Sequence, residues 1–311
     1  MKISASIVGA TAGPRAHAVD ARWPMAYAAA LGDTAPEYLD TTRRDGIIAH
    51  PLFPVCYEWP LALVLRAKTL RRAVAARSVH ATHDLRLHRR PRAGDRLSTR
   101  ATIVSAESRA PGVYVVTRFE TVDGEGRPVS TSDYGSIYRG VTGEGILAAP
   151  ERPRLRASAP EASSPASPPA GVPPLDASTS PPDWSATVSI SPTLAHVYSE
   201  CARIWNPIHT DAAVARAAGL PGIILHGTAT LALSVSKVLQ QEGVHAGASV
   251  ARIACRFGAM VPLPSTLTVV AWRAAGDGVV AFQALTEDGR AAIRDGRLTF
   301  TRSEETADGP S

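Results

Sequence analysis

The stretch "NPIHTD", residues 206–211, is the most informative in the sequence, and it ends the longer segment "RIWNPIHTD" that begins at Arg203. Its histidine, His209, is of the residue type whose unperturbed pKa of about 6.5 suits acid–base chemistry. A carboxylate that could work with this histidine is expected two residues before the asparagine, but that position holds Ile204. The segment therefore predicts an acid–base site with an apolar residue in place of its acid.

The residues before and after this segment predict two helices. In the first, Ser191-Pro192 is a typical helix start, and the residue before Pro207 is pushed out of the helical region, so this helix is expected to end at Asn206. Its apolar residues recur at helical spacing: Leu194, Val197, Cys201 and Ile204. Further on, "GIILHGTATLALSVSKVLQQ" predicts a short turn into a second helix that begins close to His226-Gly227.

The two halves of the sequence resemble each other. The segment 27–40 aligns with 198–211 without a gap, matching at a tyrosine, a proline and the terminal aspartate, and "GIIAH" (46–50) aligns with "GIILH" (222–226). Each half then continues into segments of alternating β-branched residues and Gly-containing turns, which are typical of antiparallel strands and hairpins. Blocks in the same order in both halves indicate an internal duplication of an α+β unit, with one long helix on an antiparallel sheet.

The halves are separated by a segment rich in proline, alanine and serine. No apolar face can be drawn through it, so a disordered linker is expected. The predicted organisation is an N-terminal domain (1–149), the linker (150–184), a C-terminal domain (185–303) and a disordered tail (304–311).

Composition narrows the function classes. Of 311 residues, 45% are hydrophobic and 20% charged, with a mean hydropathy of −0.02 and no apolar run of membrane-span length. The N-terminus does not predict a signal peptide, so a cytoplasmic location is expected. The three cysteines have no CxxC spacing, which predicts neither disulfides nor a metal site. The net charge of +5 includes one basic cluster, Leu85 to Arg96, which lacks interleaved aromatic residues and is interpreted as a solvated strand edge and turn, so no nucleic-acid or membrane partner is expected.

The sequence resembles the MaoC-like dehydratases, relatives of the (R)-specific enoyl-CoA hydratases, in their double-hotdog form. The resemblance rests on "NPIHTD" (206–211), on "AVARAAGLPGIILHG" (213–227) and on "CRFGAMVPLPSTLTV" (255–269). It extends over essentially the whole chain, the first half being similar to the degenerate N-terminal hotdog of two-domain members, of the FAS1-like dehydratase type. It implies an α+β double hotdog, in which each long helix is wrapped by an antiparallel sheet.

The resemblance also implies the site. An aspartate and a histidine form the family's catalytic pair, and a backbone N–H at the "HG" glycine binds the enolate oxygen; here His209, Asn206 and Gly227 match the motif. The aspartate position is Ile204 and the glycine before it is Arg203, so those roles do not transfer. The predicted substrate-binding residues are Arg203, Ile204, Trp205 and His226. The alternatives left open are turn architecture for His226, and helix-end packing with a surface ion pair for Arg203 and Trp205.

The first half retains a different part of the pattern. It keeps Asp33 at the family's acidic position, but it has Tyr38 where the second half has His209. His50 precedes Pro51, which has no N–H to offer, so the first-half site is interpreted as vestigial. Asp33 is expected to be structural, as is Glu58, although either could contribute an acid.

The expected function is therefore a hydro-lyase, a dehydratase or hydratase, that acts on a β-hydroxyacyl or enoyl thioester or on a polyketide-like substrate, with His209 as the main acid–base. Dehydration or Michael-type addition in specialised metabolism fits the missing acid best. The alternatives are a catalytically silent acyl-thioester-binding or scaffold protein, and a thioesterase. The expected partner is an acyl-CoA, a carrier-protein-bound acyl group or a polyketide-type molecule; no metal or other cofactor is implied, and a homodimer is possible.

Overall fold

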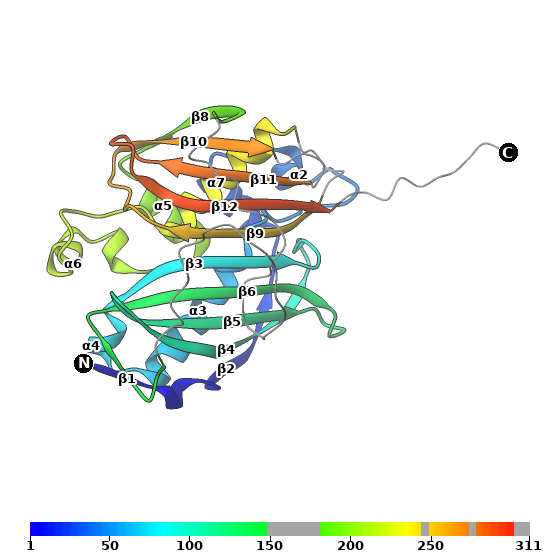
Figure 1. The fold of residues 1–311 in the computed structure, drawn as a ribbon. Coiled ribbons are helices and arrows are strands. Elements are labelled where there is room, and N and C mark those ends of the chain that lie inside the picture. Colours follow the sequence, from blue (N-terminus) through cyan, green and yellow to red (C-terminus); the bar gives the residue numbers. More distant parts are fainter. Residues whose placement is uncertain (148–180, 244–248, 274–277, 302–311) are drawn as a thin grey trace, which may run out of the picture.

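The computed structural model describes residues 1–147, 181–243, 249–273 and 278–301. Within them, one ten-stranded sheet runs through both halves in the order β2-β4-β5-β6-β3-β9-β12-β11-β10-β8 (Figure 1). All neighbouring strands are antiparallel, and the helices lie on one face of the sheet. This is the α+β double hotdog that the sequence predicts, and the prediction is confirmed.

The strands divide evenly between the halves. The first half supplies β2 (Thr11–Ala18), β3 (Ser78–Leu87), β4 (Arg96–Arg109), β5 (Gly112–Val122) and β6 (Pro128–Arg139). The second supplies β8 (Trp184–Ile190), β9 (Ser249–Phe257), β10 (Ser265–Arg273), β11 (Val279–Leu285) and β12 (Ala291–Thr301). A separate parallel pair joins β1 (Lys2–Ser4) to β7 (Thr142–Glu144).

Each half contributes one long helix that packs on its own strands. In the first half, α3 (Pro54–Thr69) contacts β2 and β4; in the second, α7 (Gly227–Gln241) contacts β10, β11 and β12. The shorter helices are α1 (Arg22–Ala30), α2 (Pro36–Leu39), α4 (Arg72–Ala75), α5 (Leu194–Ala202) and α6 (Ala212–Ala217), with the 3-10 turns η1 (Ala5–Ile7) and η2 (Pro207–His209). Among the described residues, no helix has both the length and the apolar character that crossing a membrane would require.

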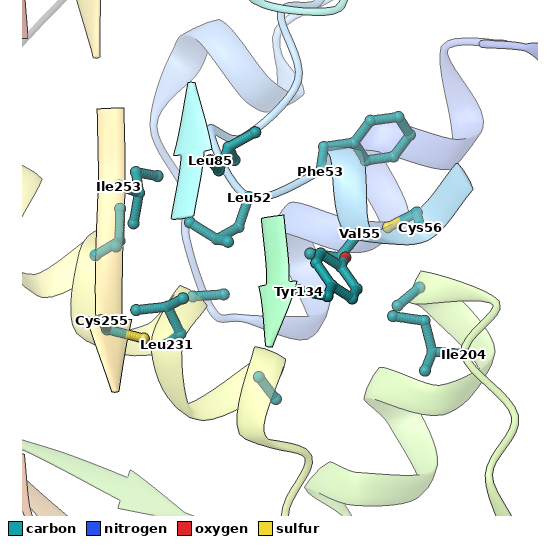
Figure 2. Packing of buried hydrophobic residues seen from close by; sticks show 14 of the residues in the cluster. Leu52, Phe53, Val55, Cys56, Leu85, Tyr134, Ile204, Leu231, Ile253 and Cys255 are labelled. Carbon is teal, nitrogen blue, oxygen red and sulfur yellow. The ribbon is translucent and has the colours of Figure 1, made fainter. Parts of the chain in front are cut away.

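The two halves form one continuous core. They meet where β3 pairs with β9, with Leu85 opposite Ile253 in the register. Figure 2 shows these two side chains beside Leu52, and Leu231 of α7 beside Cys255 of β9. All of these residues are buried and belong to one hydrophobic cluster that includes both halves.

Two sequence-based boundaries differ from the structure. The helix predicted from Ser191 to Asn206 is the shorter α5, because Thr193 is its N-cap residue and Arg203 adopts the left-handed conformation at its end. β8 begins at Trp184, the last residue assigned to the linker; the remainder of that segment lies mostly outside the described residues, as does the tail predicted for 304–311. The basic cluster, interpreted as a solvated strand edge and turn, runs from the end of β3 through a turn to the start of β4, and β3 lies at the centre of the sheet.

Candidate active site

The segment 206–211 forms a tight turn between two helices. The backbone carbonyl of Asn206 accepts a hydrogen bond from the N–H of His209 (3.1 Å), which closes the 3-10 turn η2. The Asp211 side chain accepts from the backbone N–H groups of Ala213 (2.8 Å) and Val214 (3.1 Å) and so caps α6. The turn fixes the backbone of His209, and the last residue of the motif is an N-cap residue.

His209 has one anchored and one free ring nitrogen. Its Nδ1 lies 2.8 Å from the backbone carbonyl oxygen of Ile224, and because a carbonyl only accepts, Nδ1 carries the proton. Nε2 therefore keeps a lone pair, as a general base requires. Burial lowers the pKa of His209 to about 4, and the Ile224 carbonyl partly opposes that shift. The ring is therefore neutral at neutral pH.

His226 stacks on His209. The ring centroids are 3.8 Å apart with an interplanar angle of 26°. The Nε2 of His226 lies 3.1 Å from the hydroxyl oxygen of Ser199, whereas its Nδ1 is buried without a hydrogen-bond partner. Burial, followed by the nearby His209, holds the pKa of His226 well below its usual value. Two neutral, stacked imidazoles therefore form the centre of the site.

Gly227 begins α7 directly after His226. The first N–H groups of a helix have no partner within the helix, and the helix dipole makes this end favourable for negative charge. A Cβ atom at Gly227 would lie 3.2 Å from two ring carbons of Phe257. This crowding explains the glycine, and it places the aromatic ring of Phe257 beside the helix start.

A pair of buried tyrosines joins the site to the first half. The Tyr198 hydroxyl donates to the Thr228 hydroxyl (3.1 Å) and lies 3.4 Å from the hydroxyl of Tyr27. The Tyr198 ring is 5.0 Å from that of His226. The sequence showed Tyr27 and Tyr198 as a matched pair in the duplication but did not indicate that they meet.

Ile204 is part of the core. Its side chain is 4% exposed, and Figure 2 shows it facing the region of Val55, Cys56 and Tyr134. The backbone of Ile204 is close enough to His226 to raise the pKa of that ring, which partly opposes the lowering by burial. The backbone at position 204 thus lies beside the histidine pair, while its side chain adds an apolar surface where the family has a carboxylate.

Arg203 and Trp205, on either side of Ile204, have different surroundings. Arg203 adopts a left-handed conformation (φ 58°); its guanidinium lies 4.1 Å from the Trp23 ring centroid and 3.9 Å from the Asp20 carboxylate. Trp205 is 58% exposed, and its Nε1 donates to Glu200 (3.2 Å). These contacts match the alternative of helix-end packing and ion pairing, and substrate contact by either residue stays a prediction.

The equivalent first-half residues use their polar groups within the protein. Asp33 is 4% exposed and accepts from the backbone N–H of Ala35 (3.3 Å). Nδ1 of His50 accepts from the N–H of Leu52 (3.1 Å), and its Nε2 lies 3.1 Å from the Ser236 hydroxyl. Tyr38, the counterpart of His209, packs its ring under the Arg90 guanidinium at 5.3 Å.

Glu58 is a buried acid on α3. Its two carboxylate oxygens accept from the hydroxyl groups of Ser132 and Tyr134, each at 2.6 Å. Burial raises its pKa to about 7, although both hydrogen bonds oppose that shift. Glu58 thus braces α3 against β6.

Comparison with known proteins gives the family. Residues 176–287 match the family described as "MaoC like domain", and residues 6–132 match "FAS1-like, dehydratase domain region". Over 107 residues the chain is 32% identical to enoyl-CoA hydratase ChsH3 of Mycobacterium tuberculosis; this match covers 34% of the chain and 37% of that relative, so it spans little more than a third of the relative's length.

Solved structures share the fold along almost the whole chain. A MaoC-like dehydratase from Phytophthora capsici has a TM-score of 0.76 at 21% identity and covers 95% of this chain and 96% of its own. The full-length peroxisomal multifunctional enzyme type 2 of Drosophila melanogaster has a TM-score of 0.70 at 22% identity, covering 92% of this chain and 48% of its own. Two matched domains of dehydratase type, joined in one sheet around an Asn-Pro-Ile-His turn, make this chain a member of the MaoC-like dehydratase family in its double-hotdog form.

Proposed function

We propose that the protein is a hydro-lyase that interconverts a 3-hydroxyacyl thioester and the corresponding 2-enoyl thioester, with His209 as the main acid–base. The observation that carries this proposal is the tautomer of His209. Its Nδ1–H is held by the Ile224 carbonyl, so the free Nε2 of a neutral ring can accept a proton. The acyl group would be carried by coenzyme A or by a carrier protein.

In the dehydration direction, His209 would perform both proton transfers. Nε2 removes a proton from C2, and the electrons of that C–H bond move to the thioester carbonyl as an enolate. The enolate then re-forms the carbonyl and makes the C2–C3 double bond while the C3–O bond breaks, and the hydroxyl leaves as water with the proton from Nε2. A ring with a pKa of about 4 gives its proton back readily, which favours the second transfer.

The start of α7 would stabilise the enolate. The N–H of Gly227 begins α7 directly after His226, one of the two stacked histidines. A preorganised donor of this kind, in a site screened from water, contributes most where charge develops in the transition state.

The missing acid limits the range of substrates. With Ile204 at the acidic position, no carboxylate at that position assists at C3, and the loss of one acid–base group typically costs about 10²–10⁴-fold in rate. A substrate whose C3 group leaves easily, or whose product is a conjugated polyketide-like system, needs this assistance least. Specialised dehydration or Michael-type addition therefore fits better than the hydration of ordinary fatty enoyl groups.

The burial of Ile204 favours a second candidate, an acyl-thioester-binding protein without catalysis. An apolar side chain that is 4% exposed beside the histidine pair is suited to contact a bound acyl group. This candidate predicts tight binding and no turnover.

The test compares the wild type, His209→Ala and Ile204→Asp on enoyl- and 3-hydroxyacyl thioesters, following the absorbance of the conjugated thioester. Turnover by the wild type that disappears in His209→Ala supports the hydro-lyase. Turnover that survives in His209→Ala refutes it. Binding of unreactive analogues by a wild-type protein that turns over none of the substrates supports the second candidate.

A further inference from the structure

Two histidines from the first half lie at the centre of the sheet, in the strand that joins the halves. In the register, His83 of β3 stands between Cys255 of β9 and Tyr134 of β6. Tyr134 points toward the helices, because its hydroxyl binds Glu58 of α3, so its neighbour His83 faces the same side. His80, opposite Ser136 in the register, packs its ring on those of Tyr134 (4.8 Å) and Phe257 (4.6 Å).

These histidines have polar atoms that the protein leaves unpaired. His83 is 1% exposed, and both of its ring nitrogens are buried without a hydrogen-bond partner. Nε2 of His80 is in the same situation. A buried donor or acceptor left unpaired costs about 1–3 kcal/mol, so an apolar residue would stabilise the protein better at this point of the sheet. A requirement of the core does not explain these residues, whereas a ligand would.

The histidine pair lies between the candidate active site and a cavity. On one side, the Phe257 ring that contacts His80 also lies against the start of α7 at Gly227. On the other side, Tyr134 and Ser136, the register neighbours of the two histidines, line a cavity under α3 together with Arg66 and Thr117. Contacts of His80 and His83 therefore link the surroundings of the Gly227 N–H to those of the cavity.

We infer that His80 and His83 bind an oxygen-bearing group, a hydroxyl or a ketone, in the distal part of the substrate's acyl chain. The substrate class is then an oxygenated acyl thioester rather than one with a saturated hydrocarbon chain. This inference rests on the proposed function only in taking the ligand to be an acyl thioester, and it makes the histidine pair a determinant of specificity.

The chemistry of the pair selects an uncharged oxygen. Burial holds the pKa of His83 at about 3 and that of His80 well below its usual value, so both rings are neutral. His83 offers a ligand one donor and one acceptor nitrogen, and His80 offers its unpaired Nε2. A hydroxyl matches both roles and a ketone matches the donor, whereas a carboxylate would gain no cationic partner from them. The cavity volume is only about 20 Å³, so an acyl chain enters when half-buried side chains that line it, Arg66 and Leu70, move aside.

The test measures binding, so it does not depend on turnover. Thioether analogues of acyl-CoA, with a hydroxyl or a ketone at successive chain positions, are compared by calorimetry with the analogue that has a saturated chain. The wild type should bind the best oxygenated analogue roughly 5–150-fold more tightly, which corresponds to pairing one buried polar atom that is otherwise left unpaired. In His83→Phe and in His80→Phe this preference should disappear, while the saturated analogue binds as well as before or better.

A matched control is available at His17. Its Nε2 is also buried without a partner and its ring packs on Tyr57, but it lies on β2, at the far edge of the sheet. His17→Phe should keep the preference, and His83→Phe should also raise the melting temperature of the free protein, because two unpaired nitrogens are removed. The inference is overturned if the wild type binds saturated and oxygenated analogues equally, which is the result expected if the nitrogens pair only with water. It is also overturned if the preference survives in both His83→Phe and His80→Phe.

An analogue with a terminal carboxylate serves as the charged arm. If it binds most tightly, Arg66 rather than the histidines is the recognition group, and the assignment is wrong. The outcomes also separate this inference from the proposed function. Turnover without the preference removes the inference alone, and the preference without turnover removes the hydro-lyase and leaves the binding site.

Discussion

The two halves of the molecule follow one backbone plan but use their polar groups differently. In the second half, His209 keeps a free Nε2, and it stacks on His226 beside the start of a long helix. In the first half, His50 has partners at both ring nitrogens, and Tyr38 lies under an arginine. Of these aligned positions, those of the second half leave a ring nitrogen unpaired next to a helix start.

The long helices show the same contrast. Gly227 begins α7 with an N–H to offer, whereas the equivalent Pro51 has none and lies in the turn before α3 begins at Pro54. Eight residues after each paired histidine, the first half buries Glu58 and the second buries Ser234. The first half thus holds a bracing acid within its core, whereas the second half has a small hydroxyl residue at that position and a free backbone N–H at Gly227 in place of a proline.

The largest effect is expected at the two residues that face each other in the alignment. His209→Gln retains an amide N–H for the Ile224 carbonyl but has no basic nitrogen, so kcat should fall by about 10²–10⁴-fold. Tyr38→Phe changes the equivalent first-half position and should leave kcat close to the wild-type value. Steady-state kinetics on the best thioester tests both, and a comparable loss in the two variants would mean that the first-half site is not vestigial.

The second comparison replaces Gly227 with proline, the residue at the equivalent first-half position, Pro51. Gly227→Pro removes the N–H and is compatible with the first position of a helix, so kcat should fall by about 10²–10³-fold. Gly227→Ala keeps the N–H and adds a Cβ that would lie 3.2 Å from Phe257, so it measures the effect of crowding alone. Equal losses in the two variants would remove the oxyanion role.

The buried acid of the first half predicts a pH-dependent stability. The folded-state pKa of Glu58 is raised to about 7 from 4.5, so its stabilising contribution is complete below pH 4.5 and is lost as the pH rises through 7. The total loss is about 3 kcal/mol. Buried histidines with a lowered pKa stabilise both proteins equally as the pH rises toward 6.5, so the measured quantity is the difference in unfolding free energy between the wild type and Glu58→Gln. In urea unfolding this difference should shift against the wild type by about 3 kcal/mol from pH 4.5 to pH 9, and a difference that does not change with pH would contradict the prediction.

Ile204→Asp restores the acid in the half that lost it. Asp33 is buried to the same extent as Ile204 and accepts from the N–H of Ala35, so the equivalent N–H of Asn206 can hold the new carboxylate. We expect a gain of about 10-fold in the hydration of simple enoyl thioesters, at the lower end of acid–base effects because the site is not tuned for it. The melting temperature should fall, because a carboxylate replaces a core side chain. Ile204→Asn is the uncharged control and should give no gain.

The smallest effect is expected one residue earlier. Arg203 and Gly32 share a left-handed backbone, with φ of 58° and 66°. Arg203→Gly removes backbone strain of about 1–2 kcal/mol but also loses the Trp23 stacking, worth about 0.5–1 kcal/mol, so the net change should be below about 1 kcal/mol. Gly32→Ala gains no such contact and should destabilise by about 1 kcal/mol in urea unfolding. A large loss in Arg203→Gly would show that the stacking holds the halves together.

The sequence alone indicated the secondary-structure elements, the duplication and the main candidate residue. The helical spacing before Asn206, the alternating strands and the repeated blocks led to a duplicated α+β unit, and the resemblance carried by residues 206–211 implied the double hotdog and the role of His209. Each of these signals depends on residues close together in the chain. The predicted length of α5 was wrong. The helix ends where Arg203 adopts the left-handed conformation, and an arginine gives no local sign of such an end, whereas a glycine would.

Tertiary structure decided which groups meet and which stay unpaired. The hydroxyls of Tyr27 and Tyr198 come together across 171 residues, and the tautomer of His209 depends on a carbonyl from a different segment. The unpaired nitrogens of His83 follow from its place in β3, the strand that joins the two halves. Local preferences act over a few residues and specify the elements, whereas the hydrogen-bond partners of a buried side chain are known only once distant strands have packed.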